Sequence, residues 1–156
     1  MAIASRVERY LQSQGVSYEV LTHPYTASSM ETAHAAHVSG DAVAKAIVLK
    51  DDRGYLMAVL PATHDVDVER LNGWLHRHLD LAPEGELSRL FEDCDPGAVP
   101  PIGAAYHIET VMDESLVKEP DIYFEAGNHR ELVHMQGMQF DGVEAYARWG
   151  AFSQHK

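Results

Sequence analysis

The sequence predicts a single α/β domain in which a mixed, mostly antiparallel sheet is flanked by helices. Two observations support this fold class: segments with helical and strand periodicity alternate along the chain, and several strand-like segments are joined by short turns. The 156 residues, 46% of them hydrophobic, are enough to bury a continuous core without disulfides. No repeat, low-complexity tract or linker interrupts the order, so we expect one domain over residues 1–156.

Helices and strands alternate in the first quarter of the chain. Apolar residues recur at helical spacing before Gly15, and the segment that follows it alternates and is rich in Val, Tyr and Leu. The expected elements are a helix over 3–14, a strand over 16–22 and a helix over 30–38. Pro24 and Gly40 end the last two, because proline and glycine interrupt regular structure.

A β-hairpin is the clearest element of the middle of the chain. Ala44–Lys50 and Tyr55–Pro61 are both short, apolar and partly β-branched. The residues between them, Asp51-Asp52-Arg53-Gly54, form a turn in which glycine supplies the positive φ. We expect two buried antiparallel strands here.

The second half of the chain alternates in the same way. The expected helices and strands are helices over 66–79, 83–91 and 140–149 and strands over 107–112, 122–126 and 132–135. Asp65 is the expected N-cap of the first of these helices. Residues 93–103 contain three prolines and two glycines and are expected to form a fixed loop.

Composition excludes several classes of protein. Twelve basic residues oppose 24 acidic ones, and the formal net charge of −12 argues against a general nucleic-acid binder. Cys94 is the single cysteine, so neither an internal disulfide nor a thiolate zinc site is expected. No apolar run approaches the roughly 20 residues that cross a bilayer, and the charged N-terminal segment is no signal peptide. The expected location is the cytoplasm.

Lys45 is the first candidate functional residue, because it interrupts an otherwise apolar strand. A lysine in such a strand either extends its amine to solvent or points into a cavity that holds an anion or carbonyl. Alternation places it on the same strand face as Val43, Ile47 and Leu49, the more apolar face. This placement favours the cavity.

A loop rich in proline and glycine is the second candidate. It consists of Gly97, Ala98, Val99, Pro100, Pro101, Ile102 and Gly103. A rigid backbone with exposed N–H groups can hold a carbonyl oxygen and stabilise an oxyanion. A purely structural connection between a helix and a strand explains the same composition equally well.

Glu125, Gly127 and His129 form the third candidate, at the end of an expected strand. Polar residues beside a glycine turn are frequent in binding sites, although a simple hairpin turn explains them as well.

These segments together resemble the YbaK/prolyl-tRNA-synthetase-associated editing family. The resemblance is carried by Ala44–Leu49 around Lys45, by the loop at 97–103, by Phe124-Glu125-Ala126-Gly127 and by the opening Tyr18–Pro24 with Glu31-Thr32-Ala33. Their order and spacing match over about residues 16–140.

The resemblance implies a β-barrel-like mixed sheet flanked by helices, and hydrolysis of the ester that joins an amino acid to tRNA. It assigns catalytic roles to Lys45 and Gly103, with Lys45 near the terminal adenosine and the aminoacyl group. The loop would hold the substrate through backbone amides, with Glu125, Gly127 and His129 beside it. No metal or other cofactor is implied, because a water or the substrate's ribose hydroxyl assists. Glu125 stands where the branch that hydrolyses Cys-tRNA commonly has serine, so cysteine specificity is not implied.

The acidic charge restricts how such a protein meets tRNA. We expect contact only with the acceptor end of a mischarged tRNA, through Lys45, Lys50, Arg53 and Arg130. An aminoacyl-tRNA synthetase is a possible partner, since it would raise the local substrate concentration.

Three other interpretations remain open. His34 with His37, or His76 with His78, could bind a metal, although neither pair has a further ligand at fixed spacing. The segment His64–Asp67 could bind a cation, although a helix cap explains Asp65 more simply. Cys94 with a histidine could form a thiol hydrolase, although no nucleophile elbow is present. A non-catalytic module that binds an aminoacyl-like ligand or a protein is favoured by the net charge.

Overall fold

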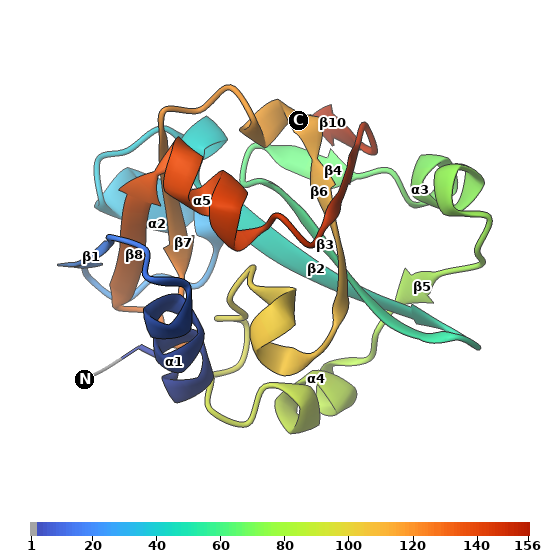
Figure 1. Cartoon of the computed structure of the whole chain (residues 1–156), viewed down its shortest axis with the longest axis horizontal. Helices are drawn as coiled ribbons and strands as arrows, with labels where there is room; N and C mark the ends of the chain where they lie inside the picture. The colour runs from blue at the N-terminus through green and yellow to red at the C-terminus, as the bar shows by residue number, and fades with distance from the viewer. Residues whose placement is uncertain (1–2) are drawn as a thin grey trace.

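The computed structural model describes residues 3–156. Its strands form three sheets (Figure 1). The largest sheet has the order β5 (Asp80–Leu81), β2 (Ala44–Asp51), β3 (Gly54–Pro61), β6 (Glu109–Asp113) and β9 (Arg148–Gly150). The second has the order β1 (Glu19–Thr22), β8 (Glu131–Gln136) and β7 (Asp121–Glu125), and the third pairs β10 (Ser153–His155) with β4 (His64–Val66). The mixed α/β fold class is confirmed, and the sheets do not close into a barrel.

Five α-helices and three short 3₁₀ helices surround these sheets in the described part of the chain (Figure 1). The α-helices are α1 (Ser5–Gln14), α2 (Ser29–Ala35), α3 (Val68–Leu75), α4 (Glu84–Leu90) and α5 (Gly137–Val143). The 3₁₀ helices are η1 (Gly40–Ala42), η2 (Gly103–Tyr106) and η3 (Glu114–Leu116). Among these residues no helix combines the length and apolarity that a bilayer-spanning segment needs.

The β2–β3 hairpin forms the centre of the molecule and is buried on both faces. Ala44 and Val48 of β2 pack in a core that also contains residues of α1, β7 and α5. Leu49 packs on the other face, in a core with Leu71 of α3. Because side chains alternate along a strand, the two cores lie on opposite sides of β2.

One edge of β2 is partly open. Strand β5 pairs with β2 at Leu49 and Lys50, and Val43 forms an isolated bridge to Tyr123 of β7. Ala46 lies between these two points of pairing. The Ala82 N–H donates to the Val48 carbonyl at this edge, and alternate residues of a strand direct their polar groups to the same edge. The N–H and C=O of Ala46 therefore face outward in the gap.

The hairpin, the N-terminal helix and strand, and the helices near residues 30 and 85 are confirmed, mostly with shorter bounds. Two expected helices differ. Helix α3 begins at Val68, and its N-cap is Asp67, whose side chain accepts from the Arg70 N–H, rather than Asp65. Only residues 140–143 of the expected helix over 140–149 are helical, because α5 ends at Val143 and Arg148 then pairs with Val111 in the parallel strand β9.

Candidate functional site

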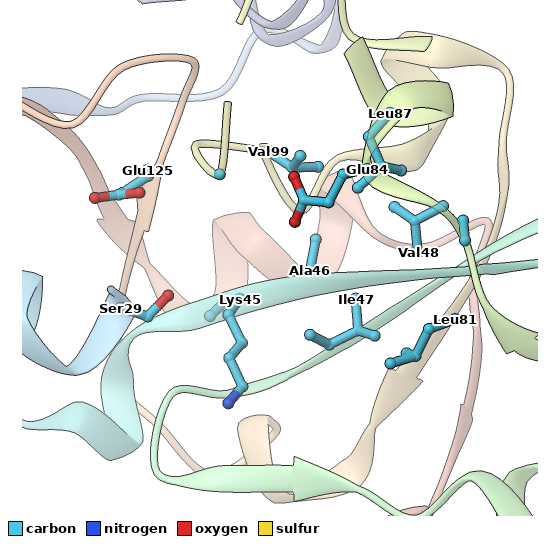
Figure 2. A pocket seen from close by; sticks show the side chains of 13 residues that line it. Ser29, Lys45, Ala46, Ile47, Val48, Leu81, Glu84, Leu87, Val99 and Glu125 are labelled. Carbon is cyan, nitrogen blue, oxygen red and sulfur yellow. The ribbon is translucent and has the colours of Figure 1, made fainter. Parts of the chain in front are cut away.

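A cavity of about 240 Å³ lies along the open edge of β2. Its lining comes from β2, from the segment that includes β5 and α4, from the proline-rich loop, and from the ends of α2 and β7 (Figure 2). The lining residues outside β2 are Ser29, Leu81, Ala82, Glu84, Leu87, Gly97, Val99 and Glu125. Sequence reasoning named Gly97, Val99 and Glu125 but missed the others, which lie on elements far apart in the chain.

Small side chains create the space in this cavity. Figure 2 shows Ala46 and Val48 directed from β2 toward Val99, Leu87 and Glu84. The methyl group of Ala46 is smaller than the side chain of Val48, the next residue on the same face of β2, and so leaves space above the strand at Ala46. The cavity therefore combines apolar walls with the outward N–H and C=O of Ala46 and the carboxyl group of Glu84, and Glu125 lies at one end of it.

Lys45 lines the same cavity as Gly97 and Val99 of the loop, but its side chain does not point toward the loop (Figure 2). It leaves β2 on the side opposite Ala46 and Val48, although its residue lines the cavity (Figure 2). The ammonium donates to the Ala62 carbonyl over 3.4 Å. Burial lowers the pKa of Lys45, the nearby Lys156 lowers it further, and Asp65 opposes both effects.

The proline-rich loop is a tight turn fastened to the end of β7. Ala98 N–H donates to the Asp95 carbonyl over 3.1 Å, and Gly97 has φ 80°, the pattern of a type II turn with Pro96 and Gly97 at its centre. Gly127 N–H donates to the Ala98 carbonyl, and Asp95 N–H donates to the Gly127 carbonyl. The amides of Ala98 and Gly127 are thus already used, so they are not free to bind an oxyanion.

The rest of the loop serves the core. Pro100, Pro101 and Ile102 are buried, and Ile102 belongs to the same core as Ala44 and Val48. Gly103, expected to be catalytic, begins η2 and does not line the cavity. A Cβ at Gly103 would lie 1.9 Å from Thr110 Oγ1 and 2.8 Å from the Ile108 carbonyl oxygen, so glycine is required there for close packing.

Glu125 lies in a buried polar network at one end of the cavity. Its Oε1 lies 2.7 Å from Thr32 Oγ1, which in turn lies 2.6 Å from Thr26 Oγ1 and 2.9 Å from the Ser28 carbonyl. An ionised Glu125 accepts the Thr32 proton while Thr26 donates to Thr32. A protonated Glu125 donates to Thr32, which then donates to Ser28. The network therefore accommodates both protonation states of Glu125.

Two buried imidazoles complete this network. His129 Nε2 lies 2.6 Å from the Pro96 carbonyl and must donate to it, so neutral His129 has its lone pair on Nδ1, 3.7 Å from Glu125 Oε2. His23 Nδ1 donates to the Pro24 carbonyl in the same way. Neither His129 Nδ1 nor His23 Nε2 has a hydrogen-bond partner among the described residues. Burial raises the pKa of Glu125, against the hydrogen bond from Thr32 and the charges of both histidines.

The basic residues expected to bind tRNA do not form one free patch. Lys50 is paired with Glu86 over 2.8 Å, and Arg53 Nη2 donates to the His76 carbonyl. Arg130 instead lies near the polar network: its guanidinium is 5.6 Å from the centre of the exposed Tyr25 ring, which lies 5.1 Å from the His129 ring. Arg130 is therefore the one of these basic residues that lies close to the Glu125 network, through Tyr25 and His129.

Cys94 is poorly suited to act as a nucleophile. Burial raises the pKa of its thiol to about 12, so the reactive thiolate is scarce at neutral pH. Its sulfur lies 3.3 Å from the Tyr106 hydroxyl.

The sequence model of the aminoacyl-tRNA editing domain matches residues 23–141, which is more than half of the chain. The chain belongs to this family. The resemblance found in the sequence is thereby confirmed, and both the open edge of β2 and the Glu125 network lie within the matched residues. None of the curated proteins matches the chain significantly.

Solved structures share the fold of this editing domain. A structure described as a putative trans-editing enzyme for prolyl tRNA synthetase has a TM-score of 0.84 and 21% identity, covering 97% of this chain and 96% of that one. The hypothetical protein APE2540 has a TM-score of 0.84 and 20% identity, covering 96% and 100%. A putative signal transduction protein from Marinobacter aquaeolei VT8 has a TM-score of 0.80 and 19% identity, and the match covers 97% of this chain but 31% of that protein. At these identities the similarity shows the fold.

Proposed function

We propose that the protein is an aminoacyl-tRNA deacylase that hydrolyses the ester of mischarged tRNA in trans. The observation that carries the proposal is the cavity on the open edge of β2, which ends at a buried carboxyl group in an editing-domain fold. Hydrolysis adds water across the ester, so that the C–O bond breaks and the products are the free amino acid and the 3′-terminal ribose hydroxyl.

Glu125 is the proposed general base. A carboxylate with a raised pKa accepts a proton from water more readily at neutral pH than an ordinary carboxylate does. The hydrogen-bond network of Thr32 and Thr26 can follow the change in protonation, and the His129 lone pair 3.7 Å away offers a second place for the proton. The same proton can then return to the leaving ribose oxygen.

The edge of β2 is the proposed binding surface for the aminoacyl group. The outward N–H of Ala46 can donate to the ester carbonyl, and such a fixed donor stabilises the oxyanion as it forms. The apolar walls near Val48, Val99 and Leu87 would then surround the side chain of the amino acid. Glu84 has a carboxyl group suited to the substrate's α-ammonium.

The acceptor end of tRNA is proposed to enter beside Tyr25 and Arg130. The ring offers a stacking surface for the terminal base and the guanidinium offers a charge for phosphate. Lys45 is proposed to contact phosphate from the rim of the cavity, because its ammonium points away from the interior (Figure 2). With a net charge of −12, the protein gains little affinity elsewhere, and a synthetase partner would compensate.

The test is a deacylation assay with a panel of mischarged tRNAs. We expect one or a few to be hydrolysed by the wild type, with kcat lost in Glu125→Gln, which keeps the size and the contact with Thr32. Glu92→Gln is the matched control, since Glu92 is an exposed glutamate outside the cavity. If no tRNA is hydrolysed while an aminoacyl-adenosine analogue still binds, the protein is a non-catalytic binding module and the proposal is wrong.

A further inference from the structure

Three side chains that commonly ligate metals meet on the side of β2 from which Lys45 extends. They are Asp41 of η1, His64 of β4 and His155 of β10, and one atom of each lies within 4.8 Å of the others. The antiparallel pairing of β4 with β10 places His155 directly opposite His64, with ring centroids 5.2 Å apart. None of the three lines the cavity described above.

The hydrogen bonds of His155 leave one nitrogen facing Asp41. Its Nδ1 lies 2.9 Å from the main-chain oxygen of Lys156, which can only accept, so Nδ1 carries a proton. In neutral His155 the lone pair is therefore on Nε2, and this atom lies 3.7 Å from Asp41 Oδ1. A lone pair and a carboxylate oxygen at this separation repel each other unless a cation or a proton lies between them.

The other two side chains are held in a way that suits the same cation. His64 Nδ1 lies 2.7 Å from Ser153 Oγ, which can accept from it and so leave the Nε2 lone pair for a ligand bond. Thr63 Oγ1 donates to Asp41 Oδ1 over 2.5 Å and fixes the carboxylate. Histidines that ligate metals characteristically donate their second nitrogen to a carbonyl or another oxygen, as both do here.

We propose that Asp41, His64 and His155 bind one divalent transition-metal ion. Two imidazoles and a carboxylate match the ligand preference of zinc, and water would complete its coordination because Asp41 and His155 are half exposed or more. The ion would join the C-terminal strand β10 to β4 and to η1, the helix that precedes β2. This role is structural and lies outside the proposed deacylation chemistry.

The alternative occupant of the gap is a proton, which would make His155 the cation of an ordinary surface ion pair with Asp41. Such a pair needs neither His64 nor a metal. If a metal ion occupies the gap, the protein binds zinc and loses affinity when Asp41 or His155 is replaced. If only a proton occupies it, the protein does not bind zinc there, so a zinc titration distinguishes the two.

The experiment uses the full chain without a polyhistidine tag, stripped with EDTA and dialysed. Zinc chloride is titrated at pH 7.5 by calorimetry, and thermal unfolding is followed with and without the ion. We expect one ion per chain and a higher Tm with zinc, because an ion that binds the folded state alone stabilises it. His155→Ala and Asp41→Asn should each weaken zinc binding by more than about tenfold.

Asp41→Asn keeps an oxygen for Thr63 while removing the charge, and circular dichroism checks that both variants fold. His78→Ala is the matched control, since His78 is exposed and lies outside the cluster, and it should bind zinc as the wild type does. Absence of zinc binding in the wild type, or undiminished binding in folded His155→Ala and Asp41→Asn, would overturn the proposal.

Discussion

Glu144 is expected to make the protein less stable as the pH rises. Its side chain is fully buried, and Tyr146 donates to Oε1 over 3.1 Å while Oε2 has no partner among the described residues. Burial raises the pKa of Glu144 from 4.5 to about 8, against the hydrogen bond from Tyr146. The folded protein therefore holds a proton that the unfolded chain releases.

Because the folded state binds one more proton than the unfolded state, the free energy of unfolding falls as the pH rises. The stabilisation is complete below the unfolded pKa of 4.5 and is lost as the pH rises toward the folded pKa of about 8. At about 1.4 kcal/mol per tenfold change in proton affinity, the full loss is on the order of 5 kcal/mol. Between about pH 5 and pH 8 the loss is on the order of 3–4 kcal/mol, a large part of the stability of an ordinary domain.

Glu144→Gln tests this value, because the amide keeps the shape and the acceptor for Tyr146 but does not ionise. Urea unfolding of both proteins from pH 5 to pH 8.5 gives the difference in their free energies of unfolding, in which the contributions of other titrating groups cancel. We expect the difference to move in favour of Glu144→Gln by several kcal/mol as the pH rises. Tyr146→Phe should extend the loss to higher pH, because the hydrogen bond that it removes lowers the pKa of Glu144 in the wild type. A difference that stays constant with pH would refute the reasoning.

Four further results are expected. Ala46→Leu should abolish deacylation with little loss of stability, because the added carbons enter the cavity; unchanged kcat/KM would show that the substrate binds elsewhere. Lys45→Ala should raise KM and leave kcat nearly unchanged, as expected for a phosphate contact at the rim, and a collapse of kcat in folded protein would place the ammonium at the ester instead. Gly103→Ala should lower the free energy of unfolding by about 1–3 kcal/mol, since its Cβ meets Thr110, and a neutral effect in urea unfolding would contradict the packing described. The salt dependence of tRNA binding should correspond to about 2–4 phosphates, and a slope for eight or more would reveal a missed basic face.

Local patterns were enough to predict the longer elements and not the shortest ones. The β2–β3 hairpin has two strands of eight mostly apolar residues around a tight turn that ends in glycine, so composition and turn chemistry both identify it. Strands β4, β5, β9 and β10 have two or three residues each, too few to show alternation. Their pairing depends on distant partners, as when Arg148 lies beside Val111, and this is why the C-terminal segment was predicted to be helical.

Only part of the candidate site could be predicted, because its residues come from segments that are distant in the sequence and meet only in the fold. The loop at 97–103 and the end of β7 do meet, but their contact uses the Ala98 carbonyl and the Gly127 N–H, and the Ala98 N–H is already bound within the turn. The partners of Glu125 could not be identified from spacing, since Thr32 lies 93 residues away in the chain. The cluster of Asp41, His64 and His155 was missed for the same reason: the metal search in the sequence compared histidines close to one another in the chain.

The orientation of Lys45 shows where the alternation rule stops being informative. Alternation correctly placed Lys45 on the face of Ile47 and Leu49, and that face is indeed apolar. The opposite face, with Ala44 and Val48, is buried as well, so apolarity could not indicate which face borders the cavity. What distinguishes the cavity face is missing volume, because Ala46 contributes a single methyl group where the wall opens (Figure 2). In a strand buried on both sides, a small residue beside an unpaired edge is therefore a better indicator of a binding site than a charged residue, whose long side chain can reach away from it.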